Sequence, residues 1–131
     1  MAVYSPFLRR VLTLDALASG ATGVLLAVGA GPLEGLLGLS PALTRPAGVF
    51  LIAYAAAVAW LASRPAFPRA LLWTVIIGNS LWVVESLSLL VTGWVHPTGL
   101  GYAFVIGQAL VVAVLADLQF MGLRRAAQIH A

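Results

Sequence analysis

The 131-residue sequence contains no cysteine and no lysine, and only 8% of its residues are charged. Without cysteine the chain has no disulfides, no thiolate metal site and no cysteine nucleophile. Because about 25% of the residues in a soluble domain are charged, the composition excludes an ordinary soluble fold. The seven basic residues, all arginine, form no cluster of the kind that binds nucleic acid, so we expect no nucleic-acid partner.

Reactive motifs are also missing. The sequence has no glycine-rich phosphate loop, no Ser-His-acid group and no pair of carboxylates that a cleft could hold. His96 has no second histidine, cysteine or acid at ligand spacing, so we predict no metal site. The sequence indicates no particular cofactor. We expect a protein without enzymatic activity rather than an enzyme.

Long apolar segments make up most of the chain, in which 62% of residues are hydrophobic. A bilayer-spanning helix needs about 20 apolar residues, and four segments come close to this length: 11–31, 47–63, 70–94 and 99–121. The sequence therefore predicts an all-α integral membrane protein, a four-helix transmembrane bundle that forms a single domain over residues 1–131. Pro32 and Glu34 favour a further short helix over 33–39, which we expect in the membrane interface.

The arginines predict the orientation of these spans. Six of the seven lie before the first span, between the second and third, or after the fourth: Arg9, Arg10, Arg64, Arg69, Arg124 and Arg125. Because cytoplasmic ends and loops collect arginine and lysine, we predict that both termini are cytoplasmic.

Glu85 is the most informative polar residue, because it lies inside the span 70–94. Ionisable residues within membranes are rare and usually functional. Counting about 1.5 Å per residue from the loops puts Gln108 of the last span at a matching depth, so the two side chains could face each other across a helix pair. They could line a path, or a single hydrogen bond could simply lock two helices. Trp82, one turn before Glu85, could stack on a pigment, quinone or lipid ring.

Depth also pairs other polar residues. Asn79 and Tyr54 fall at the same level, which predicts an interhelical hydrogen bond. Asp15 and Asp117 fall near the cytoplasmic ends of the first and last spans, where we expect ion pairs that tie the helix ends. An inner-mouth proton or cation site is the alternative. The expected ion-pair partners are Arg9, Arg10, Arg69, Arg124 and Arg125.

A stripe of small residues runs along the first span. Ser19, Gly23, Ala27 and Gly31 follow one another at four-residue intervals and leave one helix face almost without bulk. Such a face lets another helix backbone approach closely in a membrane. We predict a packing seam, either within the chain or between protomers.

Two segments, LDALASGATG (14–23) and AFVIGQALVVAVLADLQ (103–119), resemble small four-span bacterial membrane proteins. The resemblance implies the four-span fold and the bacterial inner (cytoplasmic) membrane, but no activity. Small multidrug exporters also have four short spans, and their defining acid lies inside the first span. Here the interior acid is in the third span, and the sequence is therefore not assigned to the exporter family.

Three functions are compatible with the sequence. The small-residue seam favours an interaction or accessory subunit that docks on a second copy or on a larger membrane complex. Polar residues on one face of the span 70–94 favour an oligomeric small-solute or proton-coupled transporter or channel that uses Glu85 and Gln108. A lipid- or quinone-modifying enzyme ranks third, because no reactive set supports it. Membrane lipid is the one partner common to all three.

Overall fold

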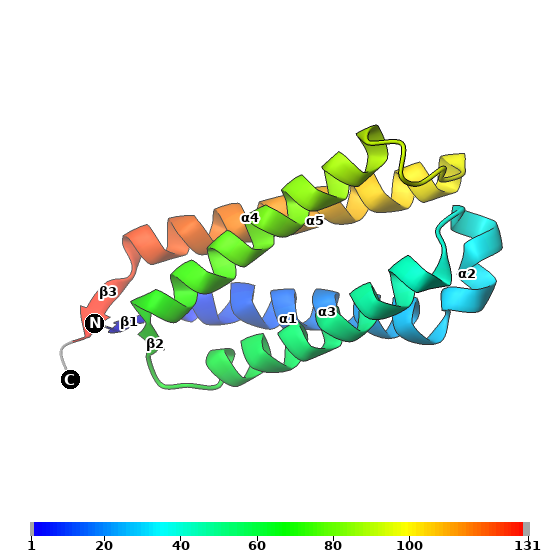
Figure 1. Ribbon diagram of the computed structural model, residues 1–131. Helices are drawn as coiled ribbons and strands as arrows, with labels where there is room; N and C mark the ends of the chain where they lie inside the picture. The colour runs from blue at the N-terminus through cyan, green and yellow to red at the C-terminus, as the bar shows by residue number, and fades with distance from the viewer. Residues whose placement is uncertain (1, 130–131) are drawn as a thin grey trace.

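The computed structural model describes residues 2–129, with side chains described up to Ala126. This part of the chain forms five helices: α1 (Pro6–Val28), α2 (Ala30–Leu37), α3 (Pro41–Ala62), α4 (Arg69–Val91) and α5 (Gly99–Arg125). Three short strands accompany them: β1 (Ala2–Tyr4), β2 (Phe67–Pro68) and β3 (Ala127–Ile129) (Figure 1). The helices α1, α3, α4 and α5 are long and apolar enough to cross a membrane. The predicted all-helical protein with four candidate spans is therefore confirmed.

The first two long helices begin earlier than hydropathy predicts, and the reason is capping. The expected span 11–31 begins at Pro6, after Ser5 accepts a hydrogen bond from the backbone N–H of Leu8 at 3.2 Å. The expected span 47–63 begins at Pro41, after Ser40 accepts from the backbone N–H of Ala42 at 3.1 Å. A serine cap followed by proline is a strong helix start whatever the hydropathy of the next residues. Consequently Asp15 lies near the middle of α1 and not near its end.

The remaining boundaries shift less. The helix expected over 70–94 is α4 and ends at Val91, while the one expected over 99–121 is α5 and continues to Arg125. The short helix expected over 33–39 is α2, which ends at Leu37 and is capped by Gly38 in the left-handed conformation (φ 69°) that glycine allows. Its end is tied to the start of α5, because Thr98 donates from its backbone N–H to Leu37 O at 3.0 Å and from its hydroxyl to Leu36 O at 2.6 Å.

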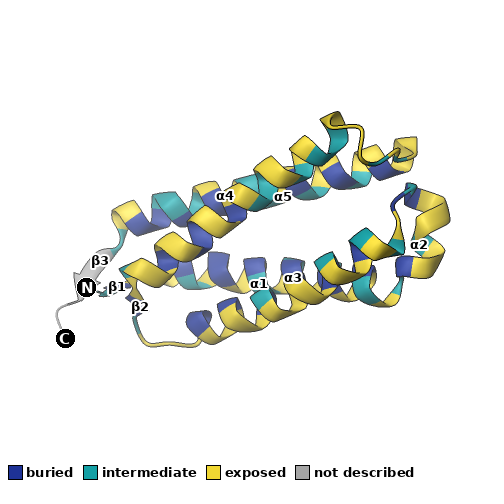
Figure 2. Ribbon diagram, viewed as in Figure 1, coloured by how far each residue is buried: buried dark blue, intermediate teal, exposed yellow. Residues whose placement is uncertain are grey.

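The helices pack as two antiparallel hairpins. α1 packs along α3, α4 packs along α5, and α1 also contacts α5 and joins the pairs (Figure 1). α3 and α4 are consecutive in the sequence but touch little. The outward faces of the helices are largely exposed (Figure 2), and they carry large apolar side chains such as Leu17, Val91 and Leu110. Apolar side chains on all faces are typical of helices surrounded by lipid.

A small antiparallel sheet closes one end of the bundle. β1 lies between β2 and β3 and brings together the N-terminal segment, the α3–α4 link and the segment after α5 (Figure 1). Arg9 reinforces this end, since its guanidinium donates to Ala62 O at 3.1 Å and Arg64 O at 2.7 Å and lies over the ring of Phe67. The sequence did not predict the sheet, because strands of two or three residues are too short to show alternation.

The tightest part of the core lies next to the sheet. Leu8, Leu12, Leu72 and Leu123, one or two from each of α1, α4 and α5, are at most 1% exposed, and Phe67 of β2 is fully buried. The opposite end, near α2, has a smaller apolar cluster around Leu37, Leu39 and Val105. The bundle is therefore densely packed at the sheet end and less so at the α2 end.

Candidate functional site

A cluster of polar side chains lies inside the bundle, and we call it the Asp15 cluster. It contains Asp15 and Ser19 of α1, Tyr54 of α3, Asn79 of α4 and Gln119 of α5. Asp15 and Gln119 are 0% exposed, and Asn79 and Ser19 are buried. All four long helices therefore contribute a polar group to one point in the interior.

Asp15 is the acceptor that holds this cluster together. Its Oδ2 accepts hydrogen bonds from the Tyr54 hydroxyl at 2.8 Å, Asn79 Nδ2 at 3.0 Å and Gln119 Nε2 at 2.7 Å. Its Oδ1 accepts from the Ser19 hydroxyl at 3.0 Å. Asn79 Nδ2 also donates to Gln119 Oε1 at 3.0 Å. Among the described side chains no buried polar atom lacks a partner, so the cost of burying these groups is met by hydrogen bonds.

The expected ion pairs at the helix ends are corrected by this arrangement. Asp15 is bonded only to neutral groups, because the early start of α1 places it one turn or more beyond the level of the arginines. Asp117 is exposed, and no arginine nitrogen among the side chains of residues 2–126 lies within 4.0 Å of an acidic oxygen. The guanidinium of Arg124 lies over the ring of Phe120 instead. The other expected partners, Arg10, Arg69 and Arg125, likewise form no ion pair with an acid among the described side chains.

The sequence predicted one contact of the Asp15 cluster and missed one of its members. The structure brings Asn79 and Tyr54 together as their matching depths predicted, with 3.0 Å between Asn79 Oδ1 and the Tyr54 hydroxyl. Gln119 was missed. Its one signal is that Gln108 and Gln119 are the only side-chain amides in the apolar run 99–121, but nothing in the sequence shows which face of the helix carries it.

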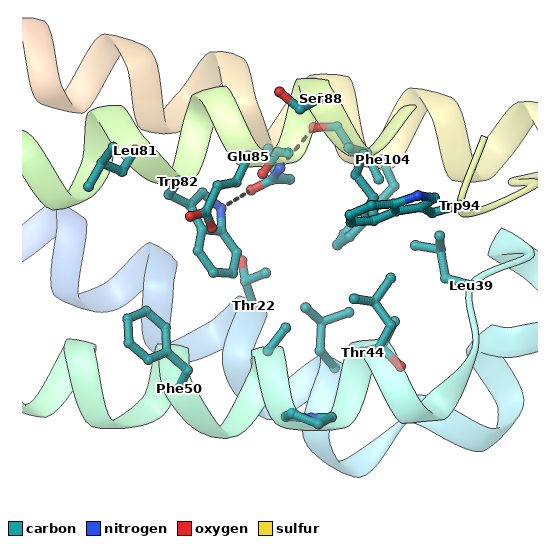
Figure 3. Close-up of a pocket in the computed structure, with 18 of the residues that line it drawn as sticks. Thr22, Leu39, Thr44, Phe50, Leu81, Trp82, Glu85, Ser88, Trp94 and Phe104 are labelled. Carbon is teal, nitrogen blue, oxygen red and sulfur yellow. Dashed lines mark hydrogen bonds between the residues drawn. The ribbon is translucent and has the colours of Figure 1, made fainter. Parts of the chain in front are cut away.

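A cavity of about 970 Å³ lies between the two hairpins, in the half of the bundle nearer α2 (Figure 3). Side chains of α1, α3, α4 and α5 line it, together with Leu39 and Trp94 of the connecting segments at the α2 end. Its walls are mostly apolar, and they include the aromatic rings of Phe50, Trp82 and Phe104. The cavity therefore extends from the level of Thr22 in α1 to the loops at the α2 end.

Trp82, Glu85 and Gln108 lie together on the wall of this cavity that α4 and α5 form. Glu85 points from α4 into it beside Trp82 (Figure 3). Trp82 Nε1 donates to Gln108 Oε1 at 2.8 Å, and Gln108 Nε2 donates to Val105 O at 2.9 Å. The Trp82 ring stacks on Phe50, with 6.0 Å between centroids and 8° between planes.

The structure thus places Glu85 and Gln108 in one cavity but does not bond them to each other. Trp82, one turn before Glu85 on α4, donates its indole N–H to the Gln108 side-chain oxygen instead. Among the described residues, no side chain or backbone group forms a hydrogen bond or ion pair with the Glu85 carboxylate. The direct Glu85–Gln108 hydrogen bond that their depths permitted is therefore not formed, although both side chains line the same cavity.

The small-residue stripe of α1 is used within the chain. A Cβ added at Gly23 would lie 2.8 Å from Gly48 O, and one added at Gly48 would lie 2.5 Å from Ala27 N. The backbones of α1 and α3 therefore meet at Gly23, Ala27 and Gly48. Ser19 belongs to the Asp15 cluster. Gly31 was expected on the same helix face, but it lies beyond the end of α1, in α2, where an added Cβ would meet nothing within 4 Å.

Metal ligands do not gather at either place. In the described part of the chain no group of three or more histidine, cysteine or acidic residues could hold a metal ion. His96 is exposed in the segment between α4 and α5.

Comparisons of this chain with protein-family models, with curated proteins and with solved structures found no match. The cavity and the Asp15 cluster are therefore the features from which a function has to be argued.

Proposed function

We propose that the protein is a small-solute transporter whose substrate site is the cavity between the two hairpins. The observation that carries this proposal is a mostly apolar cavity of about 970 Å³ that occupies only one half of a bundle of candidate membrane spans. Sites for small molecules typically measure about 300–1,000 Å³ and combine apolar walls with a few polar groups. Glu85, Gln108 and Trp82 provide polar groups here, together with the hydroxyls of serine and threonine residues in the lining.

The two ends of the bundle support the idea of a site that faces one side at a time. The cavity reaches the connecting segments at the α2 end, where Leu39 and Trp94 line it. Beyond Thr22, one turn toward the sheet, the Asp15 cluster begins at Ser19, and the tightly packed core follows at Leu12. Transporters give alternate access to a site near the middle of the membrane. In this proposal the Asp15 cluster and the core are the seal on the closed side.

Arginine positions give the proposal a direction. Arg9 and Arg10 begin α1, Arg64 and Arg69 flank the α3–α4 link, and the last turn of α5 holds two more, so six of seven arginines lie at the sheet end. By the positive-inside rule we propose that the sheet end and both termini are cytoplasmic and that the cavity faces the other side. The resemblance to bacterial four-span proteins makes the bacterial inner membrane the proposed location.

A single introduced cysteine tests the transporter, because the chain has no cysteine of its own. Thr22→Cys places a thiol at the inner limit of the cavity. In proteoliposomes of known orientation we expect a membrane-impermeant cationic methanethiosulfonate to react with this thiol from either side. The reason is that a transporter exposes its site to both sides in turn. The measurement is the fraction of modified protein by mass spectrometry after reagent is added outside or trapped inside.

Ala21→Cys is the matched control for this experiment. Ala21 is exposed on α1 next to Thr22 and does not line the cavity, so its thiol is expected in lipid and should not react with a charged reagent from either side. Reaction of Thr22→Cys from one side alone would contradict transport. Equal reaction of the two variants would contradict access through the cavity.

Assembly of several copies, or with another subunit, stays a prediction beside this proposal. The contact of Gly23 and Ala27 with α3 accounts for part of the seam that suggested it. Native mass spectrometry of protein extracted gently from its own membrane measures the assembly. We expect a multiple of the chain mass of 13.6 kDa for a homo-oligomeric transporter. A complex that contains a foreign subunit would favour the accessory function, and the mass of one chain would contradict a homo-oligomer.

A further inference from the structure

The charge of the cavity has one sign. Among the described residues that line it, Glu85 is the only one with an ionisable acid or base, since neither His96 nor any of the seven arginines belongs to its wall. Arg45, the one arginine at the α2 end, points elsewhere, since its Nε donates to Ala27 O at 3.3 Å. Any charge that the described lining residues carry is therefore negative.

Nothing within the described part of the chain compensates the Glu85 carboxylate. Gln108 Nε2 donates to Val105 O and the indole N–H of Trp82 donates to Gln108 Oε1, and neither of them donates to Glu85. The arginines that could pair with an acid lie at the sheet end or against aromatic rings. Glu85 is itself exposed, so its carboxylate is open to water and to solutes. A cation that enters this mostly apolar cavity would supply the compensating charge that the described part of the chain does not.

The walls around Glu85 fit a cation that carries apolar groups. Aromatic rings attract cations over their faces, most strongly when water is excluded. Phe50 of α3 and Trp82 of α4 stack on each other at one side of the cavity, Phe104 of α5 lines another part of its wall, and Trp94 lies at its α2 end (Figure 3). Apolar side chains between them suit hydrocarbon or aryl substituents. An anion would meet the same rings but would be repelled by Glu85.

We propose that this cavity selects organic monocations with apolar substituents, with Glu85 as the counter-charge and the aromatic rings as the walls. This inference rests on the proposed use of the cavity as a binding site, and it adds the charge and chemical class of what binds. A lipid acyl chain would fill the same apolar space without using Glu85, so charge preference is the property that separates the two occupants.

The test uses two probes of nearly the same size and shape and opposite charge, tetraphenylphosphonium and tetraphenylborate. Their affinities for the purified full-length protein in neutral detergent are measured by isothermal titration calorimetry. We expect the cation to bind at least 10-fold more tightly than the anion. Glu85→Gln should remove most of this ratio by weakening the cation, while Glu34→Gln, at an exposed acid of α2 outside the cavity, should leave it unchanged.

A second pair of variants shows whether the probes enter the cavity at all. Gly78 lines the cavity and Gly107 does not, and an added Cβ meets nothing within 4 Å at either position. Both Gly78→Phe and Gly107→Phe should therefore fold, and only Gly78→Phe should abolish binding of the cation. Equal binding of cation and anion, with both lost in Gly78→Phe, would overturn the charge selection but leave the binding site. Binding that Gly78→Phe does not change would overturn both.

Discussion

Asp15→Leu is expected to lower the free energy of unfolding by about 3 kcal/mol, which is a large part of the stability of a small protein. The substitution keeps the number of side-chain heavy atoms and removes the acceptor of four hydrogen bonds from Ser19, Tyr54, Asn79 and Gln119. Because these donors come from all four long helices, the loss should loosen the whole bundle and not one helix pair.

The size of this effect comes mainly from the donors that are left behind. Interhelical hydrogen bonds in a membrane protein average about 0.6 kcal/mol each, so the lost bonds alone predict a modest change. A buried donor without an acceptor costs a further 1–3 kcal/mol or so. The bond from Asn79 Nδ2 to Gln119 Oε1 can survive the substitution, which limits the number of orphaned donors.

Two control variants separate this explanation from a general effect of mutation. Asp15→Asn keeps an oxygen that can accept from Tyr54, Asn79 and Gln119, and it should cost about 1 kcal/mol. Asp117→Leu removes an exposed acid and should change stability by less than about 0.5 kcal/mol. The measurement is reversible unfolding by dodecyl sulfate, followed by far-UV circular dichroism. Equal stability of Asp15→Leu and Asp117→Leu would show that the cluster does not hold the bundle together.

Gly48→Ala is expected to destabilise the protein by about 3 kcal/mol, although the same change in an open helix position stabilises by up to about 1 kcal/mol. The added Cβ would lie 2.5 Å from Ala27 N and 2.6 Å from Gly23 O. Both atoms belong to the backbone of α1 and cannot turn aside as a flexible side chain could. α1 and α3 would therefore have to move apart along the most extensive helix interface of the bundle.

Gly107→Ala provides the matched control for Gly48→Ala. Gly107 lies inside α5, and a Cβ there meets nothing within 4 Å, so only the gain in helix propensity should remain. The same unfolding assay is expected to give opposite signs for the two variants. If Gly48→Ala proved as stable as Gly107→Ala, the close approach of α1 and α3 at this point would be wrong.

Some of the interior arrangement was open to prediction from depth along the helices. Counting from the loops matched Asn79 with Tyr54 and Glu85 with Gln108, and each pair does share a cluster or a cavity. Counting failed for Asp15, because hydropathy placed the helix start too late and the Ser5 cap extended α1 toward the N-terminus. It also could not show that Trp82 would take the Gln108 oxygen.

The sequence by itself determined the properties that depend on local composition. Apolar runs of sufficient length predicted the four long helices, and the small residues of α1 predicted a close helix contact. These features follow from hydropathy and side-chain size along one helix, whatever its neighbours are.

Only the tertiary structure decided which helices are neighbours and how each is rotated about its axis. Rotation turned Asp15 and Gln119 inward to meet Tyr54 and Asn79, and the separation of α3 from α4 left a cavity in front of Glu85. Depth can be counted along a helix because each residue advances it by a constant ~1.5 Å. Rotation and neighbour order depend instead on how all the helices pack against one another.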